Sequence, residues 1–145
     1  MAGFSQYLKG KIVAHVFKAT AYSAGATIAA VLHTSDPTAA ANNTEVTNAN
    51  GYARVTTGLA PSSSPSTNWQ VNGSDSGQVW SLNDVTFPTC VTSGWGTITH
   101  GSLWDSGSHN SGNMLFYGAL SQSKVIGVGD IFKFLAGGDL SVTLS

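Results

Sequence analysis

The spacing of apolar residues changes once along the chain, and the first part has the period of a helix. Between residues 4 and 18 the apolar positions recur at steps of three and four: Phe4, Tyr7, Leu8, Ile12, Val13, Val16 and Phe17. This stripe predicts an α-helix over about residues 4–18. A helix of this length is marginal in water on its own. We therefore expect the stripe to pack on the domain's own sheet, and the alternative is that part of it contacts another subunit.

From residue 27 onward the pattern is that of short strands. Alternating or β-branched segments bounded by turn residues predict strands at 27–33, 51–55, 78–82, 85–87, 96–105, 114–120, 124–128, 131–135 and 140–144. Short strands without intervening helices are typical of antiparallel sandwiches and barrels. The expected fold is mainly β, an antiparallel β-sandwich or jelly-roll-like barrel of about eight short strands with one N-terminal α-helix. We expect a single domain over residues 1–145.

The composition favours a protein that is covered by other proteins. Only 9% of the residues are charged and the formal net charge is −1, whereas an ordinary domain has about a quarter of its residues charged. A surface of Ser, Thr, Asn, Gly and Ala loses little hydration energy when a partner covers it. The same composition also fits a monomer with a neutral polar surface. Six Lys and Arg, scattered singly, form no basic stripe, so we expect no nucleic-acid partner.

Membrane and disulfide features are also missing from the sequence. No apolar stretch approaches the ~18 residues of a membrane span, so no membrane partner is expected. The N-terminal residues lack the basic and apolar regions of a signal peptide. Cys90 is the single cysteine, which excludes an internal disulfide and suggests a small core residue.

Residues that could carry catalysis or hold a metal are sparse. His100, Asp105 and His109 resemble a two-histidine, one-carboxylate metal set, but they run into a Gly- and Ser-rich turn without rigid spacing. The nucleophile-elbow pattern is absent. Gly127-Val128-Gly129 lacks the third glycine and the helix of a dinucleotide site. We expect no catalytic residues, no cofactor and no metal, and therefore no enzyme.

Aromatic and hydroxyl residues suggest where partners bind. Trp80 and Trp104 lie inside strand patterns and are expected in the core, whereas Trp69 and Trp95 lie beside polar loops. Core or edge packing, a subunit contact and a glycan contact are all compatible with these two. The hydroxyl face of the last strand is a further candidate. The candidate subunit interface comprises Phe4, Tyr7, Leu8, Trp69, Trp95, Ser141 and Thr143.

An ordered series of segments resembles a family of small tailed-bacteriophage virion proteins. The matching pieces begin with Met1-Ala2-Gly3-Phe4-Ser5-Gln6-Tyr7-Leu8 and continue through Ser35-Asp36-Pro37-Thr38, Gly51-Tyr52-Ala53-Arg54, Val85-Thr86-Phe87-Pro88, Trp95-Gly96-Thr97-Ile98-Thr99-His100, Gly112-Asn113-Met114-Leu115-Phe116-Tyr117-Gly118 and Val128-Gly129-Asp130-Ile131-Phe132-Lys133-Phe134. Members are labelled tail-fibre-like or head decoration (cement) proteins. Residues 56–84 do not share the pattern.

The resemblance implies a virion structural role without catalysis and with self-association, commonly as a homotrimer. The chain lacks a long repetitive shaft, so we expect a capsid decoration (cement) protein that stabilises the head by packing on the major capsid protein. The alternative is a tail or tail-fibre component, which could also adhere to host-surface glycans. The expected location is the virion, on the capsid exterior, after synthesis in the cytoplasm of the host bacterium.

Overall fold

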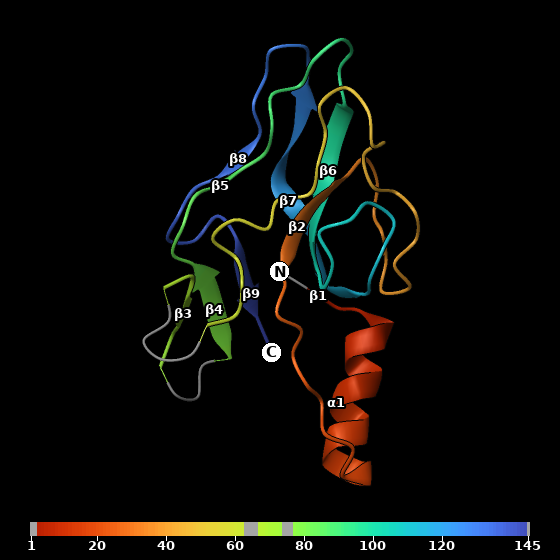
Figure 1. Ribbon diagram of the computed structural model, residues 1–145, viewed down its shortest axis with the longest axis vertical. Coiled ribbons are helices and arrows are strands. Elements are labelled where there is room, and N and C mark those ends of the chain that lie inside the picture. The colour runs from red at the N-terminus through yellow and green to blue at the C-terminus, as the bar shows by residue number, and fades with distance from the viewer. Residues whose placement is uncertain (1–2, 63–66, 74–76, 145) are drawn as a thin grey trace.

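The computed structural model describes residues 3–62, 67–73 and 77–144. It contains one helix and nine strands within these residues (Figure 1). In chain order the elements are β1 (Gly3–Phe4), α1 (Gln6–Lys18), β2 (Ala29–His33), β3 (Trp69–Val71), β4 (Gln78–Ser81), β5 (Val85–Thr86), β6 (Gly96–Trp104), β7 (Met114–Ile126), β8 (Lys133–Phe134) and β9 (Ser141–Thr143).

The strands form three open antiparallel sheets. The largest has the order β1-β7-β6-β2, the second β3-β4-β9, and the third is the pair β5-β8. All five residues of β2 are buried, with Leu32 paired to Gly101 of β6. The sequence of a strand that is covered on both faces is a continuous run of apolar residues, without alternating polar positions. The mainly β fold with one N-terminal helix is confirmed, and the open sheets correspond to a sandwich.

One hydrophobic core joins the sheets. Its largest fully buried apolar side chains include Phe87, Leu32, Leu59 and Ile98. Phe87 packs edge-on against Phe132 at a centroid distance of 5.9 Å. Cys90 is also fully buried, as expected for a small core residue.

Several predicted elements correspond closely to observed ones, but two do not. Segment 51–55 was expected to be a strand, and it makes only an isolated bridge between Val55 and Ala30. The chain turns where this segment begins, because Asn50 and Gly51 have φ of +54° and +83°. A Cβ on Gly51 would come within 2.5 Å of the Thr89 carbonyl oxygen, so this turn requires glycine.

The second correction concerns the segments 114–120 and 124–128, which were predicted as separate strands. They belong to one strand, β7, of 13 residues. The polar residues between them form an irregularity within the strand instead of a hairpin turn, since the segment keeps pairing with β6 on both sides of it. The short strands β1 and β3 were not predicted.

The predicted packing of the helix on the domain's own sheet is wrong for most of its apolar stripe. Helix α1 extends beyond the end of the large sheet along the long axis of the molecule (Figure 1). Leu8 is its one buried residue. Its last two turns therefore lie outside the core.

Candidate functional site

The exposed side of α1 is the first candidate surface, and we call it the arm stripe. It comprises four large apolar side chains with exposed fractions of 39% for Ile12, 54% for Val13, 63% for Val16 and 80% for Phe17. They lie one helical turn apart in pairs and so share one side of the helix. Large apolar side chains gathered on one exposed side of a helix mark a candidate interaction surface.

The first turn of α1 is fixed to the body of the protein. Ser5 is buried and is the N-cap, where its hydroxyl oxygen accepts a hydrogen bond from the Leu8 N–H at 3.1 Å. The same hydroxyl donates to the carbonyl of Met114 at the start of β7. The Gln6 N–H donates to the Ala39 carbonyl at 2.8 Å. The direction in which the helix leaves the body is therefore set by hydrogen bonds.

Replacing Ser5 with alanine is expected to destabilise the protein by about 1–2 kcal/mol, because the helix loses its cap and the buried Met114 carbonyl loses its donor. The loss would be measured by urea unfolding followed by circular dichroism at the helical band. Ser121→Ala, at an exposed serine, is the matched control. Equal stability of the two variants would show that the cap does not hold the arm.

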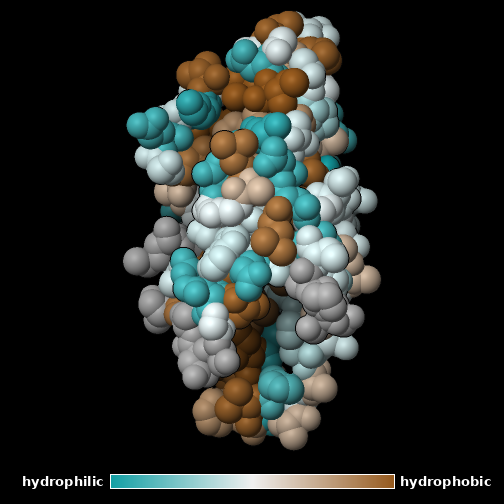
Figure 2. Space-filling model, turned by 90° about the vertical axis from the view of Figure 1, so that its left-hand side faces the viewer, coloured by the Kyte–Doolittle hydropathy of each residue, from teal (hydrophilic) through white to brown (hydrophobic). Residues whose placement is uncertain are grey.

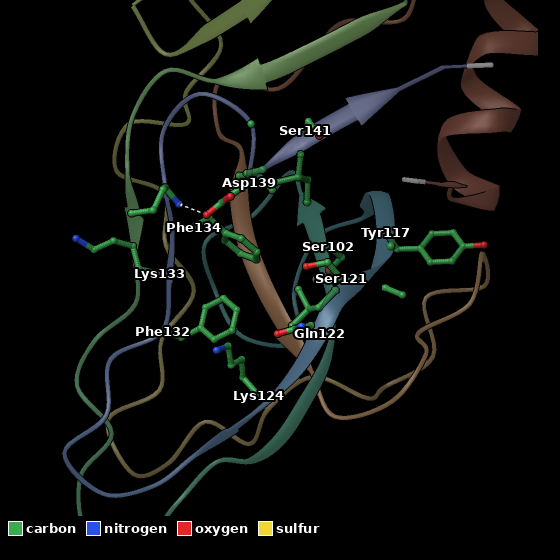
Figure 3. Close-up of a pocket in the computed structure, with 18 of the residues that line it drawn as sticks. Ser102, Tyr117, Ser121, Gln122, Lys124, Phe132, Lys133, Phe134, Asp139 and Ser141 are labelled. Carbon is green, nitrogen blue, oxygen red and sulfur yellow. Dashed lines mark hydrogen bonds between the residues drawn. The ribbon is translucent and has the colours of Figure 1, made fainter.

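The second candidate site is a cleft between β7 and the segment that leads through β8 to β9. Its volume is about 870 Å³. Figure 3 shows Gln122 and Lys124 of β7 on one side of this cleft and Phe132, Phe134 and Asp139 on the other. We call it the β7–β8 cleft.

An irregularity in β7 shapes one wall of this cleft. His100 of β6 pairs with Ala119, and Ile98 pairs with Lys124, so two residue steps on β6 correspond to five on β7. The extra residues form a bulge in β7 at Leu120–Ser123. Leu120, Ser121 and Gln122 of this bulge line the cleft. Such bulges bend a strand and redirect its side chains, and they are frequent next to functional sites.

The rim of the cleft is apolar. Val125, Ile131 and Leu135 line it with exposed fractions of 73%, 54% and 55%, and nearby Val128 is 62% exposed. Figure 2 shows hydrophobic side chains gathered at both ends of the long axis, one of which is the end where α1 projects in Figure 1. The chain therefore has two exposed apolar surfaces that are far apart.

Carboxylates stabilise the turns around the cleft. Asp139 accepts a hydrogen bond from the Leu135 N–H at 2.9 Å, and Asp130 accepts one from the Gly127 N–H at 2.8 Å. Asp84 accepts from the Ala136 N–H at 2.9 Å. This bond, together with the nearby Lys133 ammonium, lowers the pKa of the Asp84 carboxyl. These carboxylate groups place polar side chains beside the apolar rim.

A buried polar network holds the loops on the other side of the large sheet. The Arg54 guanidinium pairs with Glu45 through bonds of 2.8 and 2.7 Å, and the two side chains are 0% and 3% exposed. Its Nη1 donates to the carbonyls of Ser106 and Ser111 at 2.9 and 2.8 Å. Its Cζ also lies 4.5 Å from the centre of the Trp104 ring. Arg54 therefore fixes the 106–111 loop against the sheet.

Tyr52 and His33 extend this network. The Tyr52 hydroxyl donates to Glu45 at 3.2 Å and accepts from the Leu32 N–H at 3.1 Å. Burial raises the pKa of this phenol, so it stays protonated. His33 lies between the hydroxyls of Thr44 and Ser102, at 3.0 and 2.6 Å. Burial lowers its pKa to about 4.

The candidate interface residues expected from the sequence fall in three different places. Ser141 lines the β7–β8 cleft, and Thr143 is exposed on the same strand. Phe4 is half-buried against Phe116 with ring centroids 5.4 Å apart. Tyr7 is also half-buried, and it lines a second cavity of about 640 Å³ beside the first turn of α1.

The remaining three candidates point inward to different degrees. Leu8 and Trp95 are 5% and 6% exposed, so their expected surface position is wrong. The Trp95 indole N–H donates to the Asn50 carbonyl at 3.0 Å, which satisfies it inside the core. Trp69 is half-buried, and its indole donates to the Leu59 carbonyl at 2.8 Å. Trp80 and Trp104, expected in the core, are only half-buried.

The histidines and carboxylate that resembled a metal set have separate structural partners. His100 bonds to Thr99 at 2.8 Å, His109 to the Val46 carbonyl at 3.0 Å, and Asp105 accepts from the Asn113 N–H at 2.6 Å. Across the described part of the chain, no three His, Cys, Asp or Glu residues are grouped in a way that could hold a metal ion. The same residues include no helix long and apolar enough to cross a membrane.

A family model described as podophage GP4 fiber I protein gp80 matches residues 3–143. The chain belongs to this family. The match covers almost the entire sequence, and it supports a bacteriophage virion protein, in agreement with the resemblance seen in the sequence. No curated protein matches the chain.

Proposed function

We propose that this protein is a structural subunit of the phage tail fibre and that it acts by packing against copies of itself and a further virion protein, without catalysis. The fibre family is the observation that carries the proposal, because it favours the tail over the capsid exterior that was expected from the lack of a long repetitive shaft. Two further features support it. The arm stripe and the cleft rim leave large apolar side chains exposed on two separate surfaces, and few charged groups must be desolvated on contact.

Labelling virions with gold-coupled antibody against this chain tests the location. We expect gold at the tail in a low number of copies per particle, and particles that lack the protein should have intact heads and impaired adsorption. Gold spread over the capsid surface, together with hundreds of copies per particle, would instead support the head-decoration function. An antibody against the major capsid protein is the control for labelling of the head.

A further inference from the structure

The arm stripe and the β7–β8 cleft complement one another on the same chain. The stripe is convex and apolar, with Phe17 as its most exposed member. The cleft is concave and bordered by Val125, Ile131 and Leu135. One chain cannot bring the two together, because α1 projects from one end of the large sheet and its direction is fixed through Ser5. Two chains can.

Charge distinguishes helix-to-helix packing from packing of the helix on a body. Helix α1 contains Lys9, Lys11 and Lys18 and no acidic residue, so its formal charge is +3. The rest of the chain has three Lys and Arg and seven Asp and Glu, a formal charge of −4. Helices packed side by side would place like charges together, whereas a helix on the body of another copy would bring opposite charges together.

Lys9 lies on the same side of α1 as the arm stripe, three residues before Ile12, whereas Lys11 and Lys18 lie on the opposite side. The acids nearest the cleft are therefore candidates to meet Lys9. Asp130 and Asp139 line the cleft and are exposed, and Asp84 accepts a hydrogen bond from Ala136 in the loop that follows β8. The two cations of this region are Lys124 and Lys133, and Lys133 already lies 3.4 Å from Asp84. The side chains that line the cleft therefore carry two positive and two negative formal charges, and Asp84 next to them adds one more carboxylate.

We propose that α1 of one copy docks in the β7–β8 cleft of a second copy, with Val16 and Phe17 entering between the β7 bulge and Leu135. The inference rests on the proposed function, since it names the contact by which the fibre subunits associate. The dimensions agree: the arm stripe covers less than two helical turns, roughly 8 Å of helix, and the 870 Å³ cleft holds several side chains. A contact between two different surfaces leads to a closed ring, such as a trimer, or to an open filament along the long axis.

Complementation between two variants tests this contact. The arm variant is Val16→Ser with Phe17→Ser, and the cleft variant is Ile131→Ser with Leu135→Ser; all four side chains are more than half exposed, so folding should be unaffected. We expect each variant alone to associate about 100-fold more weakly than the wild type by light scattering. A mixture should form a heterodimer, because the cleft variant still has its arm and the arm variant still has its cleft.

The other outcomes each contradict the inference. If the cleft variant assembles like the wild type while the arm variant does not, the helices pack on one another instead. If the mixture stays monomeric, the two surfaces do not meet. If the wild type itself is monomeric over the whole concentration range, this contact is wrong, but the gold-labelling result still decides the tail location independently.

A matched control removes exposed apolar surface from elsewhere on the chain. Val71 and Val91 are 57% and 46% exposed and line neither the arm nor the cleft. Val71→Ser with Val91→Ser should associate like the wild type. A mixture of Phe17→Cys chains and Leu135→Cys chains should form a disulfide between copies. A chain that has both substitutions should form no disulfide within a monomer.

Discussion

Replacing Arg54 with methionine is expected to lower the free energy of unfolding by about 3–5 kcal/mol. The substitution leaves the Glu45 carboxylate, which is 3% exposed, without its cation. It also removes the donor from the carbonyls of Ser106 and Ser111, which Arg54 joins to the sheet. Removing one partner of a buried pair costs more than the pair itself contributes, because the remaining charge stays desolvated. Urea unfolding measured by intrinsic fluorescence would give the difference.

The exposed pair Lys133–Asp84 is the matched control for this prediction. Its side chains are 41% and 47% exposed, and the ammonium lies 3.4 Å from the carboxylate. Lys133→Met should leave the urea midpoint close to that of the wild type, because exposed ion pairs contribute little to stability. A second variant isolates the cause: adding Glu45→Gln to Arg54→Met should recover part of the loss if an uncompensated carboxylate is responsible. Similar losses for Arg54→Met and Lys133→Met would contradict the role of the buried pair.

The helix and most strands could be predicted because their signals are local. The three- and four-residue spacing of apolar residues predicts α1 regardless of where the helix packs. The turn residues around β4, β5 and β6 mark the ends of these strands in any tertiary arrangement. Where the helix docks is a tertiary property. The same apolar stripe fits both a buried and a projecting helix, so only the structure shows that Phe17 is exposed.

The cleft had little signal in the sequence. Its wall depends on the register between β6 and β7, where Ile98 pairs with Lys124, and such pairing is not encoded in either strand alone. The polar residues Ser121–Ser123 separated two predicted strands, since bulges and the breaks between strands use similar residues. Ser141 was the one cleft residue among the predicted interface residues, and it was found through the alternation of the last strand.

The burial of the tryptophans also could not be predicted from local sequence patterns. Trp95 was placed at the surface because polar residues flank it in the sequence, but Tyr52 packs edge-on against its ring at 5.4 Å and the Asn50 carbonyl accepts its N–H. A distant carbonyl that satisfies an indole cannot be seen in a local pattern. The network of Glu45 and Arg54 was likewise missed, since single charged residues in a strand-like segment usually face solvent.

Acidification is expected to weaken the fold through His33. This ring is fully buried between Thr44 and Ser102, and Glu45, Arg54 and His100 are the charged or titratable groups that act on it. Burial lowers its pKa from 6.5 to about 4, so the folded protein holds the neutral ring. In the unfolded chain the ring takes up a proton already near pH 6.5. Stability is therefore complete above that pH and is lost as the pH falls toward about 4.

The size of this effect follows from the difference between the two pKa values. The free energy of unfolding should fall by about 2 kcal/mol between pH 7 and pH 5 and by about 3 kcal/mol at pH 4. The part of this pH range closer to pH 7 is the more informative, because carboxylates ordinarily titrate at lower pH. His33→Gln should start from a lower stability but show a flatter dependence on pH, and His15→Gln, at an exposed histidine of α1, should follow the wild type. A wild-type slope in His33→Gln would mean that another group titrates. With the expected result, the part of the large sheet next to the Arg54 network becomes less stable in acid because its buried histidine must take up a proton.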